Sequence, residues 1–182
     1  MEVASTASGG TPSRSDPRNF GGGIPWVKSG EVSQGLITQT DETISQLGLA
    51  TSSARLMPPG TVLVAMYGAT AGEVGTLGVE AATNQAVCCI TPGRDLDRDF
   101  LLESLRTMKT LLKQRAVGGA QPNLSQSDIR GLELKIPPMA QQQEFSRLVQ
   151  AAREAEHYVS RQAEALDSLF ASLQHRAFRG EL

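Results

Sequence analysis

The hydrophobic positions in the first three quarters of the chain form short, continuous runs. Three of them, Thr61–Met66, Val74–Val79 and Ala86–Thr91, are apolar, rich in β-branched residues and too short to make good helices. Gly68 and Gly72 lie between the first two runs and indicate a tight turn, because glycine supplies backbone freedom. We therefore expect three strands of a buried sheet, the first two joined by a hairpin.

Weaker patterns predict further strands. Residues 24–28 (IPWVK) and 31–39 are candidates for short strands, the first confined to an edge or a strand start by Pro25. Residues 132–136 (LELKI) alternate and predict another strand. Residues 1–23 are rich in Ser, Thr, Gly and Pro and are predicted to be loop.

Helical periodicity begins after the strands. Asp97 is the expected N-cap of one helix that continues to Arg115, with apolar residues at a 3.6-residue period. Thr40–Thr43 is expected to cap a short helix that ends at Gly48. Ser125–Asp128 is expected to start a single helical turn.

A different pattern follows Pro137 and Pro138. Residues 140–178 contain no Gly or Pro, and apolar residues recur in alternating steps of three and four, which predicts a coiled-coil helix. All but one of the nine seam positions are apolar; the exception is Gln162, and the others are Phe145, Leu148, Ala152, Ala155, Val159, Leu166, Leu169 and Leu173. The seam could pack on the chain's own globular part, but we favour a partner helix, because that part is too small to cover the whole rod. The fold class expected is an α/β (α+β) globular domain, residues 1–137, followed by a long helix, residues 138–182.

Composition narrows the class of protein. The 182 residues carry 17 basic and 19 acidic side chains, a net charge of −2, and 40% are hydrophobic, so a globular protein is expected. No apolar run could span a membrane, and the N-terminus has no apolar signal segment, so we expect a cytoplasmic protein. Cys88 and Cys89 are adjacent in an apolar run and are expected to be buried free thiols.

The sequence offers no recognisable catalytic or metal site. His157 and His175 have no metal-ligand spacing, and no Cys-x-x-Cys pair or nucleophile elbow is present. The glycine-rich turn resembles a phosphate-binding loop, but Gly72 is followed by Glu73 rather than by the required lysine. A binding or scaffolding protein without metal or cofactor is therefore expected.

One segment has a local excess of positive charge. From Ser104 to Ser127 the only charged residues are basic: Arg106, Lys109, Lys113 and Arg115. They could contact phosphates, or they could be a solvated helix face whose charges suit the helix dipole. Charge alone favours neither interpretation.

Six motifs together carry a family resemblance. They are SGGTPSR (8–14), IPWVKSG (24–30), GTVLVAMYGATAGEVG (60–75), ATNQA (82–86), GGAQPNLS (118–125) and IPP (136–138) before the long helix. In order and spacing the chain resembles the specificity subunit of type I restriction–modification systems. The resemblance implies a target-recognition domain that reads double-stranded DNA, followed by a conserved helix, with no catalysis of its own. It also implies docking of modification (methyltransferase) and restriction subunits.

The chain departs from the family pattern in two ways. It holds one domain–helix unit where the family usually has two, and the short strand expected before SGGTPSR is not evident. We therefore expect a homodimer whose long helices pair antiparallel and whose two domains read inverted copies of one half-site. The alternative is an assembly or decoy protein that docks modification subunits through its helix and binds no DNA.

The polar residues of the shared motifs are the candidates for DNA contact, together with two basic residues of the predicted helix. They are Thr11, Ser13, Arg14, Lys28, Ser29, Tyr67, Thr70, Asn84, Gln85, Lys113, Arg115, Gln121 and Asn123. Arg14 and Lys28 suit phosphate or guanine, and the Asn and Gln side chains suit adenine edges. The alternative is that these residues hold the scaffold, while residues 31–56 and 93–117 carry the choice of sequence.

Overall fold

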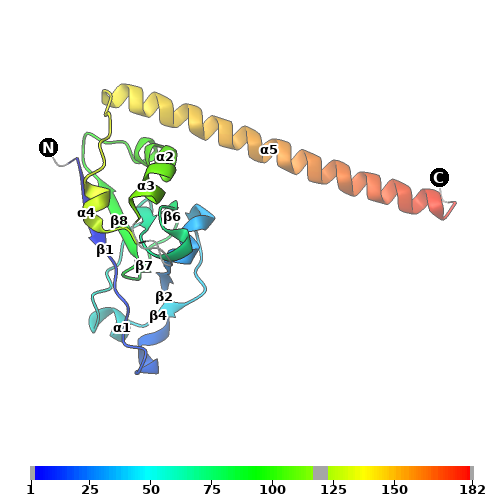
Figure 1. Cartoon of the computed structure of the whole chain (residues 1–182). Helices are drawn as coiled ribbons and strands as arrows, with labels where there is room; N and C mark the ends of the chain where they lie inside the picture. The colour runs from blue at the N-terminus through cyan, green and yellow to red at the C-terminus, as the bar shows by residue number, and fades with distance from the viewer. Residues whose placement is uncertain (1–2, 117–122, 181–182) are drawn as a thin grey trace. The chain divides into compact units, whose positions relative to one another are not determined.

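The three apolar runs form neighbouring strands, as predicted. The structure is a computed structural model that describes residues 3–116 and 123–180 (Figure 1). In it the runs are β5 (Val62–Ala65), β6 (Val74–Leu77) and β8 (Val87–Pro92). The chain divides into a unit of residues 1–142 and a helical unit of residues 143–182, so the expected class, an α+β domain followed by a long helix, is confirmed.

The main sheet has five strands in the order β1-β8-β5-β6-β3. Strand β1 (Ala4–Ser8) is antiparallel to β8, while β3 (Leu36–Ile37) is parallel to β6. The prediction of loop at residues 4–8 was wrong, as was the expectation that no strand precedes the SGGTPSR motif. The error has a physical cause: β1 is an edge strand of small, half-exposed residues, so its sequence lacks the apolar signal of a core strand.

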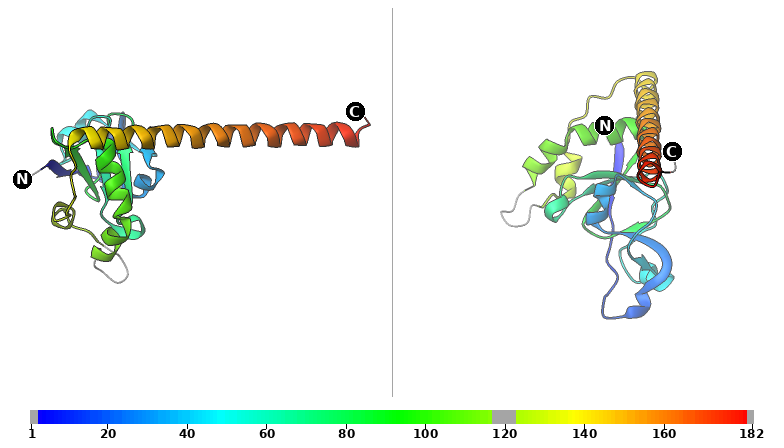
Figure 2. Two further views of the ribbon diagram at one scale, coloured as in Figure 1. Left: turned by 90° about the horizontal axis from the view of Figure 1, so that it is seen from above. Right: turned by 90° about the vertical axis from the view of Figure 1, so that its right-hand side faces the viewer.

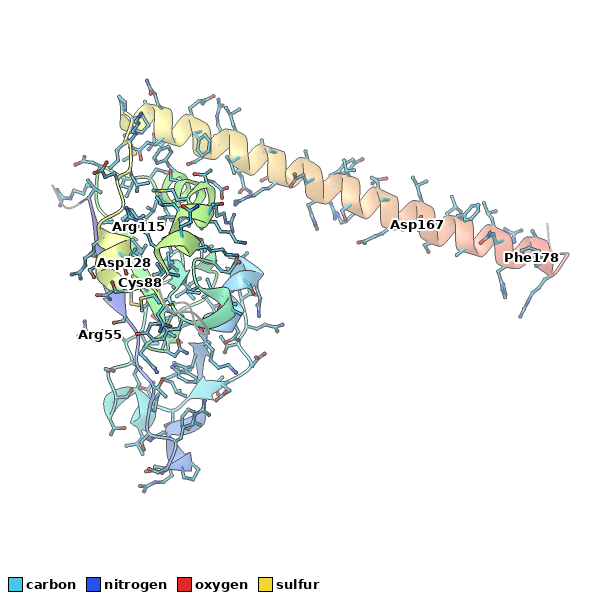
Figure 3. The ribbon with its side chains drawn as sticks, in the orientation of Figure 1. Arg55, Cys88, Arg115, Asp128, Asp167 and Phe178 are labelled. Atoms are coloured by element: carbon cyan, nitrogen blue, oxygen red, sulfur yellow. The ribbon has the colours of Figure 1, made fainter. Side chains whose placement is uncertain are left out.

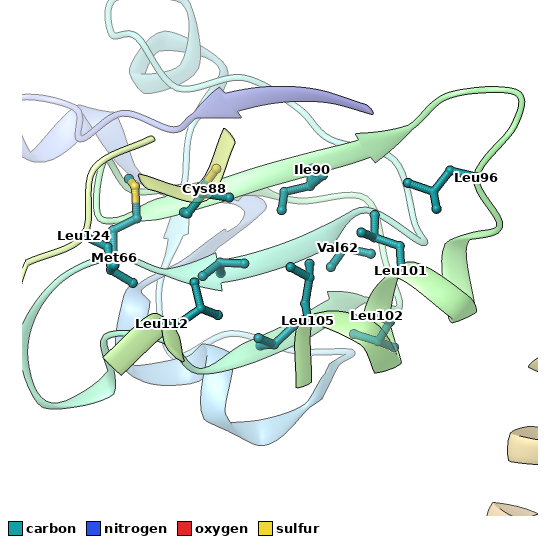
Figure 4. Close-up of a cluster of buried hydrophobic side chains, with 13 residues drawn as sticks. Val62, Met66, Cys88, Ile90, Leu96, Leu101, Leu102, Leu105, Leu112 and Leu124 are labelled. Carbon is teal, nitrogen blue, oxygen red and sulfur yellow. The ribbon is translucent and has the colours of Figure 1, made fainter. Parts of the chain in front are cut away.

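Both faces of the main sheet are buried, which explains the continuous apolar runs. Val62 and Val64 contribute to one hydrophobic cluster, and Leu63 and Ala65, which alternate with them, contribute to another. Figure 4 shows the first cluster, between the strands and the helices that follow them. Cys88 and Cys89 belong to opposite clusters, so the two free thiols point away from each other. Burial, with a smaller contribution from Cys89, raises the pKa of Cys88 to about 12.

The turn between β5 and β6 has the geometry that its glycines predict. A short 3-10 helix, η3 (Gly68–Thr70), fills it, and Gly68 and Gly72 have φ angles of 74° and 85°. These values lie in the left-handed region, which favours glycine. The carboxylate of Glu73 follows the second glycine and accepts ion pairs from Lys109 and Lys113.

Two helices replace the single helix predicted from Asp97 to Arg115. They are α2 (Arg98–Thr107) and α3 (Lys109–Arg115), separated by a turn at Met108. The predicted cap is confirmed, because Asp97 Oδ1 accepts hydrogen bonds from the backbone N–H groups of residues 99 and 100, at 3.0 and 2.9 Å. The apolar period did not reveal the turn, because α2 and α3 pack on the same hydrophobic cluster.

A smaller sheet has the order β4-β2-β7. Strand β2 (Phe20–Val27) begins earlier than predicted and is antiparallel to β4 (Thr43–Ile44) and parallel to β7 (Ala82–Thr83). The strand predicted over residues 31–39 is wrong for most of its length, because the 3-10 helix η2 (Ser29–Gln34) precedes β3.

The short helix predicted between Thr43 and Gly48 begins and ends later in the structure. Helix α1 (Gln46–Ala50) is capped by Ser45, whose hydroxyl accepts a hydrogen bond from Gly48 N at 3.0 Å. The predicted cap at Thr40–Thr43 was wrong, since its last residue lies in β4, and Gly48 lies inside α1 rather than at its end. Both Thr40–Thr43 and Ser45 have the composition of a helix cap. Because Thr43 pairs with β2, the helix begins only after Ser45.

In the last part of the globular unit one predicted element is present and another is not. Helix α4 (Gln126–Arg130) is the predicted single turn, capped by Ser125. Residues 132–136 do not form the predicted strand. Their alternation has another cause: Leu132, Leu134 and Ile136 pack on the first hydrophobic cluster from a segment that pairs with no strand.

Helix α5 (Met139–Phe178) is one uninterrupted helix of 40 residues, as the absence of Gly and Pro predicts (Figure 2). Its first turn belongs to the globular unit. There the buried Gln142 amide donates to the carbonyls of Asp95 and Pro137, at 3.0 and 2.8 Å, and accepts from Asp97 N at 2.8 Å. The buried amide of Gln142 thus has hydrogen-bond partners for both its oxygen and its nitrogen, and it ties the start of α5 to the loop that leads into α2.

Candidate nucleic-acid interface

Several of the predicted contact residues gather at one end of the main sheet. Ser8 pairs with Cys88 and Ala65 with Val87, so β1 and β5 end where β8 begins. The loops that follow or precede these strands therefore meet at this end. They carry Thr11, Tyr67, Asn84, Gln85 and Asn123, which we call the polar edge.

Specific contacts hold the polar edge together. Thr11 donates its hydroxyl hydrogen to Gln85 Oε1. Asn84 Oδ1 accepts a hydrogen bond from Ala86 N at 3.1 Å, and Tyr67 forms an isolated backbone bridge with Asn123. The Tyr67 side chain is nevertheless 43% exposed, and Gln85 and Asn123 are exposed. The edge therefore presents a phenol and two amides that can hydrogen-bond to the edges of bases.

Close packing fixes the loop before Thr11. A Cβ atom on Gly9 would overlap the Thr83 carbonyl, and one on Gly10 would overlap Ser53 and the backbone of Ala54. The indole Nε1 of Trp26, which is 2% exposed, donates to the Gly10 carbonyl at 3.0 Å. The two glycines of the SGGTPSR motif thus permit a close approach that positions Thr11.

Arg14 and Lys28 lie in a second group, around one carboxylate. Glu42 accepts from Arg14 Nη1 at 2.7 Å and from Lys28 Nζ at 3.1 Å, and Arg14 also stacks over Phe20, 4.4 Å from the ring centroid. Hydrogen bonds from Arg14 and then Lys28 hold the pKa of Glu42 below its usual value, so the ion pairs persist at neutral pH and are lost only in acid. The same hydrogen bonds are the largest cause of the raised pKa of Arg14 and Lys28.

The serines of these motifs have local roles in the structure. Ser13 shares a 2.8 Å hydrogen bond with Ser15, and Ser29 begins η2 directly after Lys28. Ser13 is exposed and Ser29 is half-buried.

A third group lies at the turn between β5 and β6. Lys113 pairs with Glu73 at 3.4 Å and lines a small cavity together with Gly68. Thr70 ends η3 in the same turn and is half-buried. Burial raises the pKa of Glu73, but the hydrogen bonds and charges of Lys109 and Lys113 outweigh it and leave the pKa lowered. Lys113 is about half exposed, so part of its charge remains available to a ligand.

Arg115 has a structural role in this chain. Its Nη1 donates to the carbonyls of Asp128 and Gly131, at 3.0 and 3.2 Å, and so ties α3 to α4 (Figure 3). An Arg115 substitution would therefore disturb the fold as well as any phosphate contact. Gln121, the remaining candidate, lies outside the described residues.

Sequence reasoning did not single out Glu42, Arg55 or Gln142. Nothing in the pattern marks Glu42, because its partners are distant in sequence. Arg55 lies in the 31–56 segment expected to carry sequence choice, and its charge was the available signal. Gln142 is a polar residue one helical turn before the seam begins, and only its burial reveals its role.

The seam of α5 is exposed in this chain. Every residue from 154 to 180 is exposed, and Leu148, Val159 and Leu166 are 59%, 64% and 65% exposed. The other large seam residues, Phe145, Leu169 and Leu173, are between 41% and 56% exposed. Such a row of apolar side chains is typical of a helix that packs against another helix.

Two classes of site are absent from the described residues. Within residues 3–116 and 123–180, no three His, Cys, Asp or Glu side chains are grouped so that they could hold a metal ion. In the same part of the chain, no helix combines the length and hydrophobicity that a membrane crossing requires.

Comparison with known proteins gives a consistent result. The family described as type I restriction modification DNA specificity domain matches residues 1–157. The HindI specificity subunit of Haemophilus influenzae is 32% identical over 133 residues, which are 71% of this chain and 29% of that protein. The MjaIX specificity subunit of Methanocaldococcus jannaschii is 26% identical over 153 residues, 81% of this chain and 35% of that protein.

A solved structure has the same fold. The HsdS subunit from Thermoanaerobacter tengcongensis superposes with a TM-score of 0.69 at 18% identity, covering all of this chain and 44% of that one. The chain thus spans less than half the length of the relatives that it matches.

Proposed function

Because this chain belongs to the family of type I restriction–modification DNA specificity domains, we propose that it is a sequence-reading subunit that acts as a homodimer of half-subunits. Each protomer supplies one recognition domain and one long helix. The dimer reads a bipartite site and directs modification and restriction subunits to it. The chain itself contributes no catalytic group and no cofactor.

The main support for the dimer is the exposed apolar seam of α5. A helix of 40 residues extends about 60 Å, and most helical stability in proteins comes from packing an apolar face. A second copy of the same helix, packed antiparallel, would bury the seam along its length. Two-fold symmetry then places identical domains at opposite ends.

The positions beside the seam suit further helices. In a two-stranded coiled coil the flanking positions are often Glu and Lys. Here they include Tyr158 and Phe170, which are 58% and 63% exposed, and several alanines: Ala151, Ala163, Ala165 and Ala177. An apolar stripe wider than the seam favours more than one neighbouring helix, which is how a modification subunit would dock.

The polar edge supports a role in reading bases. Gln85 and Asn123 expose amides that can pair with adenine edges in the major groove, and Asn84, whose Oδ1 already accepts from Ala86 N, remains a candidate through its NH2 group. Arg14, Lys28 and Lys113 are the candidates for phosphate contact, and Thr11, Ser13, Ser29, Tyr67, Thr70 and Gln121 remain candidates for either role. Arg115 would contribute through the position of α4.

The proposal is tested by two measurements on the full chain. Light scattering after gel filtration should give twice the chain mass at micromolar concentration. Selection from random duplexes should then enrich two inverted copies of one half-site with a fixed spacer, since half-site spacing follows protein geometry. A clean monomer, or an enriched site without inverted symmetry, would contradict the homodimer.

Replacing Glu42 with glutamine is expected to strengthen DNA binding. The change removes the carboxylate that Arg14 and Lys28 share. Lys28 then keeps only its 3.6 Å ion pair with the exposed Asp41, so both cations become more available to phosphates. The slope of log K against log salt should become steeper by up to about 0.9 for each new contact. Glu80→Gln, the same charge change at an exposed turn, is the matched control. If Glu42→Gln and Glu80→Gln give equal slopes of log K against log salt, Arg14 and Lys28 are not phosphate contacts.

The same carboxylate favours a second candidate function. With Arg14 and Lys28 compensated and a net charge of −2, the chain could act as an assembly or decoy protein that docks modification subunits without binding DNA. Co-purification with a modification subunit, combined with no retention of any duplex, would support this function over the first.

A further inference from the structure

A polar groove lies beside the polar edge and contains an arginine that no motif marks. The groove has a volume of about 310 Å³ and lies between β1, the loop after α1 and the start of α4. Its polar lining comprises Thr6, Ser8, Ser53, Arg55 and Gln126, and none of its lining residues is acidic. We call it the Arg55 groove; Figure 3 labels Arg55 at the side of the globular unit.

The side chains of the Arg55 groove offer hydrogen-bond donors. Arg55 is exposed, and no hydrogen bond or ion pair joins its guanidinium to another described residue. The hydroxyls of Ser8 and Ser53 likewise have no partner among the residues that the structure describes. Thr6 Oγ1 accepts from Arg130 Nε at 2.7 Å, which leaves the Thr6 hydroxyl hydrogen free to donate.

A cluster of donors whose lining includes no acidic side chain suits an anion. A guanidinium presents five N–H groups in a fixed fork, which matches the oxygens of a phosphate, and hydroxyl side chains are common partners of DNA phosphates. Strand β1 is also the edge strand of the main sheet, so one side of its backbone has no strand partner. The groove therefore has the chemistry of a phosphate diester site.

The location of the groove links this anion to DNA. The backbone of Gly10 lies so close to Ser53 and Ala54 that a side chain at residue 10 would overlap both. Thr11, the next residue, hydrogen-bonds to Gln85 of the polar edge. The loop that carries Arg55 is thus packed directly against the loop that carries Thr11.

We propose that the Arg55 groove binds a backbone phosphate of the DNA next to the bases that the polar edge reads. Arg55 supplies the charge, and Thr6, Ser8 and Ser53 supply hydroxyl donors. This inference rests on the proposed function and adds to it a positioning contact, because phosphate contacts fix the register of a protein on a duplex.

The test measures how the full chain binds a random-sequence duplex over a series of salt concentrations, by fluorescence anisotropy. Arg55→Ala should lower the magnitude of the log K against log salt slope by about 0.9 and weaken binding about eightfold at 0.1 M salt, the effect of one released counterion. Arg55→Lys should keep most of the slope. Arg94→Ala is the matched control, because Arg94 is exposed in the turn after β8, at the opposite end of the β1–β8 pair.

The outcomes separate this inference from the function on which it rests. A smaller slope for Arg55→Ala alone supports the phosphate site. If the native chain binds duplex and Arg55→Ala behaves like Arg94→Ala, the inference is overturned and the proposed function stands. If the native chain retains no duplex at any salt concentration, both are wrong. Unchanged melting temperatures establish that the exposed substitutions leave the fold intact.

Discussion

Replacing Leu166 with aspartate is expected to convert the dimer into a monomer. Burying a leucine side chain contributes about 2 kcal/mol, and two-fold symmetry removes that contribution twice. The resulting loss of about 4 kcal/mol corresponds to a dimer dissociation constant roughly 1,000-fold weaker, since each 1.4 kcal/mol is a factor of ten. The cost of placing two carboxylates in an apolar interface adds to this loss.

Sedimentation or light scattering over a dilution series measures this change, and circular dichroism at 222 nm reports the helix. Ser168→Asp is the control, because position 168 lies outside the seam and its flanking positions and receives the same charge. We expect Ser168→Asp to remain dimeric and Leu166→Asp to lose helical signal. If both variants dissociate alike, the seam is not the dimer interface.

Replacing Trp26 with alanine is expected to destabilise the globular unit by about 3–5 kcal/mol, the usual cost of removing a buried tryptophan. Trp26 fills the cluster under the smaller sheet, and its loss also leaves the Gly10 carbonyl without its donor. Single domains are stable by only about 5–15 kcal/mol, so this change removes a large share of the total. Because the indole positions Gly10, duplex binding should weaken too.

Urea unfolding followed by circular dichroism measures the change, because Trp26 is the only tryptophan and its replacement removes the tryptophan fluorescence signal. Trp26→Phe keeps most of the ring and loses the hydrogen bond, and should cost about 1–3 kcal/mol, because the Gly10 carbonyl is left unsatisfied. If alanine costs no more than phenylalanine, the ring does not hold this part of the core as described.

The sequence predicted those elements whose signal is local. The apolar runs of β5, β6 and β8 and the Gly- and Pro-free stretch of α5 each carry their own evidence, and each is present. Strand β1 carries none, because its identity depends on pairing with β8. The alternation at residues 132–136 was real but ambiguous, since a core-facing segment alternates whether or not it joins a sheet.

The sequence predicted which residues belong to the candidate site, but not which of them contact one another. Motif residues Thr11 and Gln85 were selected as separate loop residues, and only the strand pairing shows that they touch. The charges of Arg14 and Lys28 were readable, whereas their shared partner, Glu42, was not. An ion pair between two distant segments produces no periodic pattern in a sequence, so it cannot be predicted from periodicity.

The pairing of β1 with β8 has a consequence for how the domain folds. The paired residues are 80 to 88 positions apart in the chain, from Ser8 with Cys88 to Ala4 with Pro92. Closing so long a loop is entropically costly, and folds dominated by such distant contacts form slowly. During synthesis β1 emerges well before β8, and it cannot join the sheet until β8 has left the ribosome. The wall of the Arg55 groove that β1 forms is therefore completed late, after the strands that the sequence marks most clearly.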